Sequence, residues 1–249
     1  MNKKRIKTEL LIHDLKNPLA VIEVGISSLI QKGEKYGPLT DKHLRVLHRT
    51  LRNSKLAKSL VNDILEVGRS SEGIIKKKKF PVKEFVKKPL VVVFDLNDFG
   101  TAEKIRESIS LPEIKEVLKT KGITLKIDQD MWSQELFLDG RKLRQIFRNL
   151  LSNALKYRLK EIEIEIKEED GCFFVSVSDD GEGISKAYHE KIFECYFQLD
   201  GEQNHCVRGH GLGLAGVLML VEDMGGRLIL DSDEGQGTKF SVLIPLGEE

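Results

Sequence analysis

The 249-residue sequence has three cysteines and no long apolar run. Cys172, Cys195 and Cys206 are irregularly spaced and lack the paired spacing of metal ligands, so reduced thiols are favoured over a disulfide framework. No segment approaches the roughly 20 apolar residues of a membrane span, and the charged opening MNKKRIKTE has no apolar core of a signal peptide. These absences predict a soluble chain that works in the cytoplasm.

A charge excess is also lacking, because 40 basic residues nearly balance 39 acidic ones and the formal net charge is +1. Such a balance gives no electrostatic reason to expect nucleic acid or an anionic membrane as a partner. The four lysines at 76–79 are interpreted as a solvated stretch between domains. At 40% hydrophobic residues, the chain can form one or two domains with their own cores.

Two apolar stripes predict two long helices in the first 72 residues. Leucine and isoleucine recur every three or four residues from Lys3 to about Lys32, and leucine, isoleucine and valine do so from Thr40 to about Gly68. The segment GEKYGPLTD between them holds two glycines and a proline and should turn the chain, and Thr40 can cap the second helix. Two such helices bury little alone, so we expect a dimeric four-helix bundle.

His13 is predicted to point away from the apolar stripe of the first helix, because it lies two residues from both Leu11 and Leu15. Asp14 follows it, Asn17 lies one turn on, and Pro18 removes a backbone hydrogen bond beside it. An exposed histidine on a helix is usually inert, and these residues alone leave that interpretation open.

Residues 139–157 predict a helix with two different sides. Asp139 is a candidate N-cap. Asn149, Asn153 and Lys156 are four and then three residues apart, so they share one stripe of the helix. An amide oxygen can ligate Mg²⁺, and a lysine one turn on would meet phosphate charge. A solvated amphipathic helix explains the same stripe, so this helix alone does not distinguish a ligand site from a solvated surface. The buried side is predicted to hold Leu143, Ile146, Phe147, Leu150, Leu151, Ala154 and Leu155.

The strand predicted over CFFVSVSD ends in a carboxylate on its buried side. Asp179 alternates with apolar residues at the period of two, and a buried carboxylate needs a hydrogen-bond donor. The exocyclic amine of adenine is such a donor, and Gly181 and Gly183 would let the backbone approach a flat base. Further on, Gly209, Gly211 and Gly213 open a predicted helix, whose free N–H groups suit phosphate.

In this combination and order, the segments resemble the ATP-binding domain of two-component sensor histidine kinases, which is related to the ATPase domains of gyrases, mismatch-repair proteins and heat-shock chaperones. RNLLSNALKY is similar to the N box, IFECYFQ to the F box, and DDGEGI, GHGLGL and GQGTKF to the three G boxes. This likeness runs from about Phe80 to Leu246. HDLKNP resembles the H box of the same kinases, and the second predicted helix follows it where their phosphotransfer domain requires.

The resemblance implies a role for each matching residue. His13 would be the phosphoacceptor, Asp14 its acid/base partner, and Asn17 the residue that positions water to dephosphorylate a response regulator. Asn153 would bind Mg²⁺ and Asp179 would read adenine. The other implied nucleotide-binding positions are Asn149, Lys156, Tyr157, Gly181, Gly183, Ile184, Arg208, Gly209, Gly211, Leu212, Gly213, Leu214 and Thr238.

The implied fold class is multidomain, α and α+β. A helical hairpin at 1–72 would form the dimeric four-helix bundle, 73–79 would link it to the next domain, and 80–249 would form an α/β sandwich of the histidine kinase and gyrase ATPase type, with helices on one face of a mixed sheet. Residues 186–208 would be a lid over the nucleotide.

The lid and residues 89–118 depart from the pattern of the family. In the lid, the aromatic residues Phe193, Tyr196 and Phe197 are predicted anchors, and Gln198 stands where the family often has a basic residue, so Arg208 is the alternative phosphate contact. Residues 89–118 are longer than the family usually needs. There Val91 to Phe94 are predicted to add a strand, and residues 102–118 one or two short helices.

The resemblance implies a sensor histidine kinase core that uses ATP and Mg²⁺ to phosphorylate itself on His13. It would pass the phosphoryl group to an aspartate of a response regulator, and it is a candidate phosphatase for that regulator. Expected partners are the regulator and a second copy of the chain, with no nucleic acid. The chain is expected in the cytoplasm, alone or as the cytoplasmic part of a longer membrane-bound sensor. A gyrase- or chaperone-type ATPase and a non-catalytic dimeric scaffold stay open as alternatives.

Overall fold

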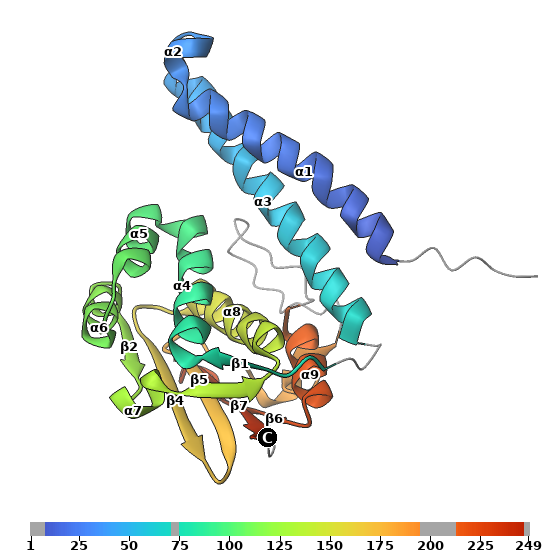
Figure 1. The fold of residues 1–249 in the computed structure, drawn as a ribbon, viewed down its shortest axis with the longest axis vertical. Coiled ribbons are helices and arrows are strands. Elements are labelled where there is room, and N and C mark those ends of the chain that lie inside the picture. The colour runs from blue at the N-terminus through green and yellow to red at the C-terminus, as the bar shows by residue number, and fades with distance from the viewer. Residues whose placement is uncertain (1–7, 71–74, 195–212, 247–249) are drawn as a thin grey trace, which may run out of the picture. The chain divides into compact units, whose positions relative to one another are not determined.

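The computed structural model describes residues 8–70, 75–194 and 213–246, and the chain divides into two compact units, 1–72 and 73–249. The first unit is helical, whereas the second combines helices with a sheet (Figure 1). Among the described residues, no helix is long and apolar enough to cross a membrane.

The first unit is a helical hairpin, as predicted. It consists of α1 (Thr8–Gln31), the short α2 (Gly33–Tyr36) and α3 (Asp41–Ser70), and α1 lies along α3 (Figure 1). Oγ1 of Thr40 accepts the backbone N–H of His43 at 3.2 Å, so Thr40 caps α3 as expected. The Ser54 hydroxyl donates to the Leu19 carbonyl at 3.3 Å and ties the two long helices together.

The second unit places helices over a mixed sheet of five strands. Its main elements are β1 (Lys78–Pro81), α4 (Val82–Asn97), α5 (Phe99–Glu107), α6 (Leu111–Lys119), β2 (Ile123–Lys126), α7 (Gln129–Ser133), β3 (Glu135–Leu138), α8 (Gly140–Tyr157), β4 (Ile162–Glu169), β5 (Cys172–Asp179), α9 (Gly213–Asp223), β6 (Arg227–Ser232) and β7 (Thr238–Pro245). Two 3₁₀ turns, η1 (Lys186–Tyr188) and η2 (Lys191–Phe193), follow β5.

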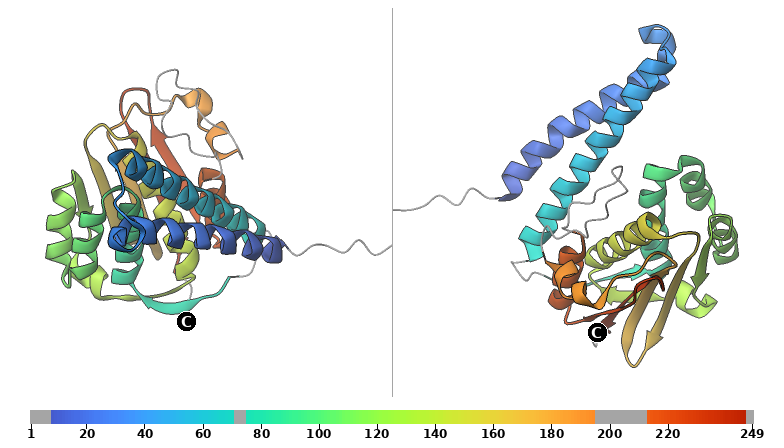
Figure 2. Two further views of the ribbon diagram at one scale, coloured as in Figure 1. Left: turned by 90° about the horizontal axis from the view of Figure 1, so that it is seen from above. Right: turned by 180° about the vertical axis from the view of Figure 1, so that it is seen from behind.

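The strand order in the sheet is β2-β4-β5-β7-β6, with β2 parallel to β4 and the other pairs antiparallel. A separate antiparallel pair joins β1 to β3. The isoleucines of β4 are buried while the glutamates between them reach the other face, as the period of two requires. Helices α8 and α9 pack on the sheet, and α4 packs on α8 (Figures 1 and 2).

Three phenylalanines join the helices to the sheet. Phe85 of α4, Phe147 of α8 and Phe173 of β5 are fully buried. The Phe85 ring centroid lies 5.2 Å from that of Phe147 and 5.2 Å from that of Phe173, and it meets Phe173 edge to face. Such aromatic contacts add to the burial of their apolar area, so this cluster fixes α8 at the centre of the unit.

Residues 89–118 differ from their prediction in one element. The strand predicted from Val91 to Phe94 is wrong, because these residues lie inside α4. A short apolar run fits a buried strand and a buried helix equally well, and the buried residues Val86, Leu90 and Val93 show the helical spacing. The helices predicted within 102–118 are confirmed as α5 and α6.

Asp98 attaches these added helices to the body of the unit. It caps α5 by accepting the backbone N–H of Thr101 at 3.1 Å, and its other oxygen lies 2.7 Å from Nζ of Lys121, just before β2. The Lys121 ammonium, helped by Thr101, lowers the pKa of Asp98 to about 2.

Asp139 is confirmed as the N-cap of α8 and has a second role. One carboxylate oxygen accepts the N–H groups of Arg141 and Lys142, and the other accepts the N–H of Lys76 at 3.0 Å. The carboxylate is 2% exposed. Strand β1 then begins at Lys78, inside the stretch expected to be a linker. One buried side chain therefore holds both the start of α8 and the chain that enters β1.

Replacing Asp139 should destabilise the second unit. We expect Asp139→Ala to lower the free energy of unfolding by about 2 kcal/mol, because it leaves buried N–H groups without an acceptor. Asp139→Asn keeps one oxygen for the helix but cannot accept from Lys76, so its loss should be smaller. Urea unfolding followed by the fluorescence of Trp132, the only tryptophan of the sequence, measures both. Equal midpoints for Asp139→Ala and the natural protein would contradict the capping role.

Candidate functional site

Helix α8 turns its predicted stripe toward the first residue of α9. Leu143, Ile146, Phe147, Leu150, Leu151 and Ala154 are buried, whereas Asn149, Asn153 and Lys156 are only partly covered. Nδ2 of Asn149 donates to the carbonyl of Gly213 at 3.3 Å. The structure therefore brings two of the predicted binding segments, 64 residues apart in the chain, into contact.

The last turn of α8 carries a lysine and a tyrosine that contact each other. Nζ of Lys156 donates to the hydroxyl of Tyr157 at 2.8 Å and lies 4.5 Å from its ring centroid. The tyrosine is 57% exposed. Both residues were predicted to bind the phosphate and ribose side of a nucleotide, and the structure places them side by side at the end of the stripe.

Asp179 is a half-buried carboxylate at the end of β5, as the alternation predicted. Its Oδ1 accepts the N–H of Gly181 at 3.0 Å. Burial raises the pKa of Asp179, the Gly181 hydrogen bond opposes this shift, and the charge of Asp180 adds to it. A carboxylate in such a place is well suited to accept a hydrogen bond from a ligand.

Asp180, the next residue, has a structural role. Its carboxylate accepts the N–H groups of Leu159 and Lys160 at 2.9 and 3.0 Å, which ties the turn after α8 to the end of β5. These backbone hydrogen bonds, that of Lys160 first, lower the pKa of Asp180. The pKa values of these two adjacent carboxylates are therefore shifted in opposite directions, and only Asp179 of the two is partly buried.

Two glycine-rich loops, residues 179–184 and 233–238, pack backbone against backbone. Gly183 and Gly237 have φ angles of +73° and +79°. A Cβ at Gly183 would collide with the Asp233 carbonyl, and one at Gly237 with the Asp179 carbonyl. A Cβ at Gly181 would collide with the carbonyl of Tyr157 at the end of α8. Glycine is required at Gly183 and Gly237 by close approach as well as by conformation, and at Gly181 by close approach.

Ser232 joins the two loops and was not among the predicted site residues. Its hydroxyl donates to the Gly237 carbonyl at 2.7 Å, accepts the Ile184 N–H at 2.8 Å and lies 3.2 Å from Oγ1 of Thr238. The side chain is 8% exposed. The signal was present in the alternation of Leu228, Leu230 and Ser232, which puts a serine on the buried side of β6.

The described start of the predicted lid is attached to the same loops. Phe193 meets Phe240 of β7 edge to face at 6.3 Å, so this expected anchor packs on the core. His189 donates from Nε2 to the Ile184 carbonyl at 3.0 Å. The remaining lid and phosphate-binding predictions, Tyr196, Phe197, Gln198, Arg208, Gly209, Gly211 and Leu212, lie outside the described residues.

The structure thus connects most of the predicted nucleotide-binding residues that it describes. Contacts run from Asn149 to Gly213, from Tyr157 to Gly181, and from Ile184 through Ser232 to Thr238. Asn153 lies one turn after Asn149 on α8, and Leu214 follows Gly213 on α9.

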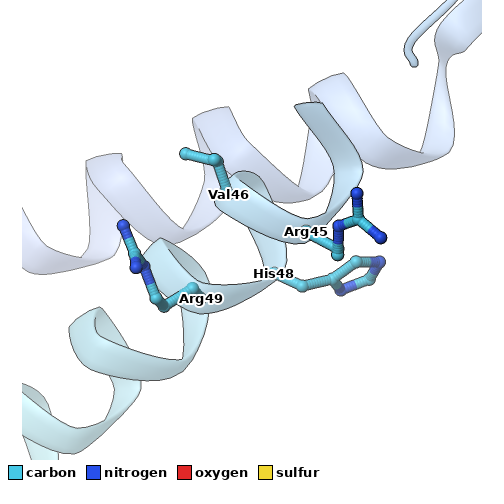
Figure 3. A pocket seen from close by; sticks show the side chains of 4 residues that line it. All are labelled: Arg45, Val46, His48 and Arg49. Atoms are coloured by element: carbon cyan, nitrogen blue, oxygen red, sulfur yellow. The ribbon is translucent and has the colours of Figure 1, made fainter. Parts of the chain in front are cut away.

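The other predicted site residues lie in the first unit. The backbones of His13 and Asp14 are part of α1, and their side chains lie outside the described part of the chain. Asn17, one turn on, is exposed. A hollow on α3, lined by Arg45, Val46, His48 and Arg49, contains none of the predicted site residues (Figure 3).

Two family models match the chain in succession. The model described as "His Kinase A (phospho-acceptor) domain" matches residues 11–73, which include His13. The model described as "Histidine kinase-, DNA gyrase B-, and HSP90-like ATPase" matches residues 138–248, from the end of β3 through β7. The second match contains α8, Asp179 and both glycine-rich loops.

Curated relatives are similar over nearly the whole chain. Sensor histidine kinase WalK of Bacillus subtilis is 27% identical over 95% of this chain and 36% of its own length. Circadian input-output histidine kinase CikA of Synechococcus elongatus is 31% identical over 94% of this chain and 29% of its own length. The chain therefore spans about a third of the length of these curated relatives.

Solved structures of histidine kinases share the fold. Full-length ShkA in complex with AMPPNP aligns with a TM-score of 0.66 and 22% identity over 98% of this chain and 46% of that one. The Acinetobacter baumannii histidine kinase AdeS aligns with a TM-score of 0.56 and 16% identity, over 95% of this chain and 98% of that one.

Gly183 and Gly235 allow the cost of backbone strain to be told apart from the cost of a steric collision, because their φ angles are similar. Gly183 and Gly235 have φ of +73° and +76°, but a Cβ at Gly235 meets nothing within 4 Å. We expect Gly235→Ala to cost about 1 kcal/mol through its backbone alone, and Gly183→Ala to cost about 3 kcal/mol or more because the loops must separate. Urea unfolding measures the free energy of unfolding of both variants, and equal losses of this free energy would contradict the packing of the loops.

The two aspartates should respond oppositely to neutralisation. The raised pKa of Asp179 means that the folded state binds its proton more tightly than the unfolded state does, so ionised Asp179 destabilises the ligand-free protein at neutral pH. Asp179→Asn should therefore raise the melting temperature at pH 7, and this gain should shrink as the pH falls toward 4. Asp180→Asn should lower it at pH 7, with a loss that also shrinks on acidification, because the pKa of Asp180 is lowered. If both substitutions changed the melting temperature in the same direction at pH 7, the opposite pKa shifts of the two carboxylates would be contradicted.

Proposed function

The chain has the catalytic core of a two-component histidine kinase, and on that premise we propose that it transfers the γ-phosphoryl group of ATP to His13 and then to an aspartate of a response regulator. The observation that carries this proposal is the succession of two matches, a phosphoacceptor domain that contains His13 followed by an ATPase domain that contains the connected site.

The adenine base is proposed to bind at Asp179. The carboxylate is half-buried and its pKa is raised by burial, so a hydrogen bond from the adenine amine would stabilise its ionised form. Gly181 is buried, and a side chain there would collide with both Tyr157 and the Asp179 carboxylate. The absence of a side chain at Gly181 keeps this carboxylate accessible to the edge of a base.

The phosphates are proposed to lie between the stripe of α8 and the start of α9. Gly213 and Leu214 supply the first N–H groups of an 11-residue helix, and Lys156 supplies a cation. The family resemblance adds Arg208, Gly209, Gly211 and Leu212. AMPPNP, the ATP analogue in the complex with ShkA, supports a nucleotide as the ligand of this fold.

Mg²⁺ fits the donors that this site offers. The described residues contain no group of three His, Cys, Asp or Glu side chains that could hold a metal by themselves. Mg²⁺ is typically bound through one or two protein oxygens together with phosphates and water, and the amide oxygen of Asn153 is the proposed protein ligand. When bound, the ion would neutralise charge on the transferring phosphoryl group.

His13 is proposed to act as the nucleophile in its neutral form. One imidazole nitrogen forms the new N–P bond as the bond between the γ-phosphorus and its bridging oxygen breaks, and ADP leaves with that oxygen. Asp14 would orient the ring and offset the developing positive charge. Asn17, one helical turn on, would align water for removal of phosphate from the regulator.

A second copy of the chain is the proposed partner of the hairpin. Val21 and Val24 of α1 are 72% and 70% exposed, and Leu15 is 52% exposed. Two helices cannot cover these apolar side chains, whereas a second hairpin would enclose them in a four-helix bundle. The use of ATP supports a cytoplasmic location. No observation favours the gyrase- or chaperone-type ATPase or the scaffold, because the phosphoacceptor match precedes the ATPase match.

His13→Gln should abolish phosphorylation of the chain by γ-labelled ATP and leave nucleotide binding intact, because the two sites lie in different units. The label on the natural protein should be acid-labile and stable in alkali, as expected for phosphohistidine. His48→Gln, at an exposed histidine of the same unit, is the matched control and should retain the label. Labelling of His13→Gln at the level of the natural protein would overturn the assignment.

A further inference from the structure

A lysine is buried between α8 and α9, outside the N box and the glycine-rich segments. The side chain of Lys142 is 3% exposed, and its Nζ lies 2.7 Å from Oδ2 of Asp223, which is 18% exposed. The two residues are 81 positions apart. Their pair joins the first turn of α8 to the last residue of α9.

Such an ion pair fixes the relative position of two helices more than it stabilises the folded chain. Removing an ammonium and a carboxylate from water costs about as much as their attraction returns, so a buried ion pair adds little over an apolar contact of the same volume. A slide of one helix on the other would separate the two charges and take the buried ammonium of Lys142 away from its carboxylate. The pair therefore favours one register of α9 on α8.

Lys142 also extends the stripe that carries the proposed nucleotide ligands. It precedes Asn149 by seven residues, Asn153 by eleven and Lys156 by fourteen, which are close to two, three and four helical turns. The same line of α8 thus begins with a contact to α9 and continues with the residues proposed to meet Mg²⁺ and phosphate.

Helix α9 is held to this line at both ends. At its start, the carbonyl of Gly213 accepts from Asn149, and at its end Asp223 pairs with Lys142. The helices consequently run in opposite directions where they meet. A shift of α9 along α8 would move the N–H groups of Gly213 and Leu214 relative to Asn153.

We propose that Lys142, together with Asp223, is a positioning residue for the nucleotide: the buried pair sets the register of α9 so that its first turn stands at the correct distance from Asn153 and Lys156 for the phosphates. This proposal rests on the proposed ATP site. It assigns to Lys142 no contact with the nucleotide.

The test compares nucleotide affinity with stability in the full chain. Lys142→Met keeps much of the side-chain volume and removes the charge. At a temperature where every variant is folded, we expect its dissociation constant for trinitrophenyl-ATP, and the KM for ATP in His13 labelling, to rise about tenfold. Lys142→Arg, which keeps the charge, should recover most of the affinity.

Two further variants separate positioning from stability. Lys126→Met removes an exposed pair with Glu163, whose side chains are 54% and 41% exposed, and should bind nucleotide as the natural protein does. The double variant Lys142→Met/Asp223→Leu removes both charges of the pair, so its melting temperature should recover while its nucleotide affinity stays low.

Natural affinity in folded Lys142→Met would overturn this proposal alone. Recovery of affinity together with melting temperature in the double variant would also overturn it, because the pair would then act only through stability. If the natural protein bound no nucleotide, the proposed function would fail and this proposal with it. The affinity of the natural protein therefore distinguishes the two failures.

Discussion

The packing of one side of α8 is the constraint on which the candidate site depends. Phe85 of α4 contacts both Phe147 of α8 and Phe173 of β5, and all three rings are buried, so the rotation of α8 about its axis is fixed. A helix repeats every 3.6 residues, and fixing its buried side also fixes the direction of every other stripe. Asn149 and Asn153 reach the site because the apolar residues between them are held in the core.

Polar groups around the site divide into those that build it and those that remain for a ligand. Ser232 and Asp180 use their hydrogen bonds on backbone groups of neighbouring loops, and two glycines let those loops touch. Asp179 remains half-buried with a raised pKa, which weakens the ligand-free fold at neutral pH. A ligand that donates a hydrogen bond to such a carboxylate would remove this destabilisation, so a destabilising carboxylate is expected at a binding site.

Local sequence patterns predicted the structure correctly wherever the residues that determine a feature lie close together in the chain. Residues within a few positions of one another predict the caps Thr40 and Asp139, the stripe of α8 and the burial of the β5 face that leads to Asp179. The prediction failed from Val91 to Phe94, because a short run that is apolar at every position shows neither the alternation of a strand nor the spacing of a helix. Packing of α4 on α8 decided that segment.

The sequence by itself determined the order of the phosphoacceptor and ATPase segments, the two helices of the hairpin, and the residues that share a helical or strand face, since capping and periodicity are local properties. Only the tertiary structure decided what Ser232, Asp180 and Lys142 do. Ser232 meets Ile184 across 48 residues, Asp180 meets Lys160 across 20, and Lys142 meets Asp223 across 81. A single hydroxyl, carboxylate or ammonium carries no periodic signal, and its role depends on which distant group the folded chain places within hydrogen-bonding distance.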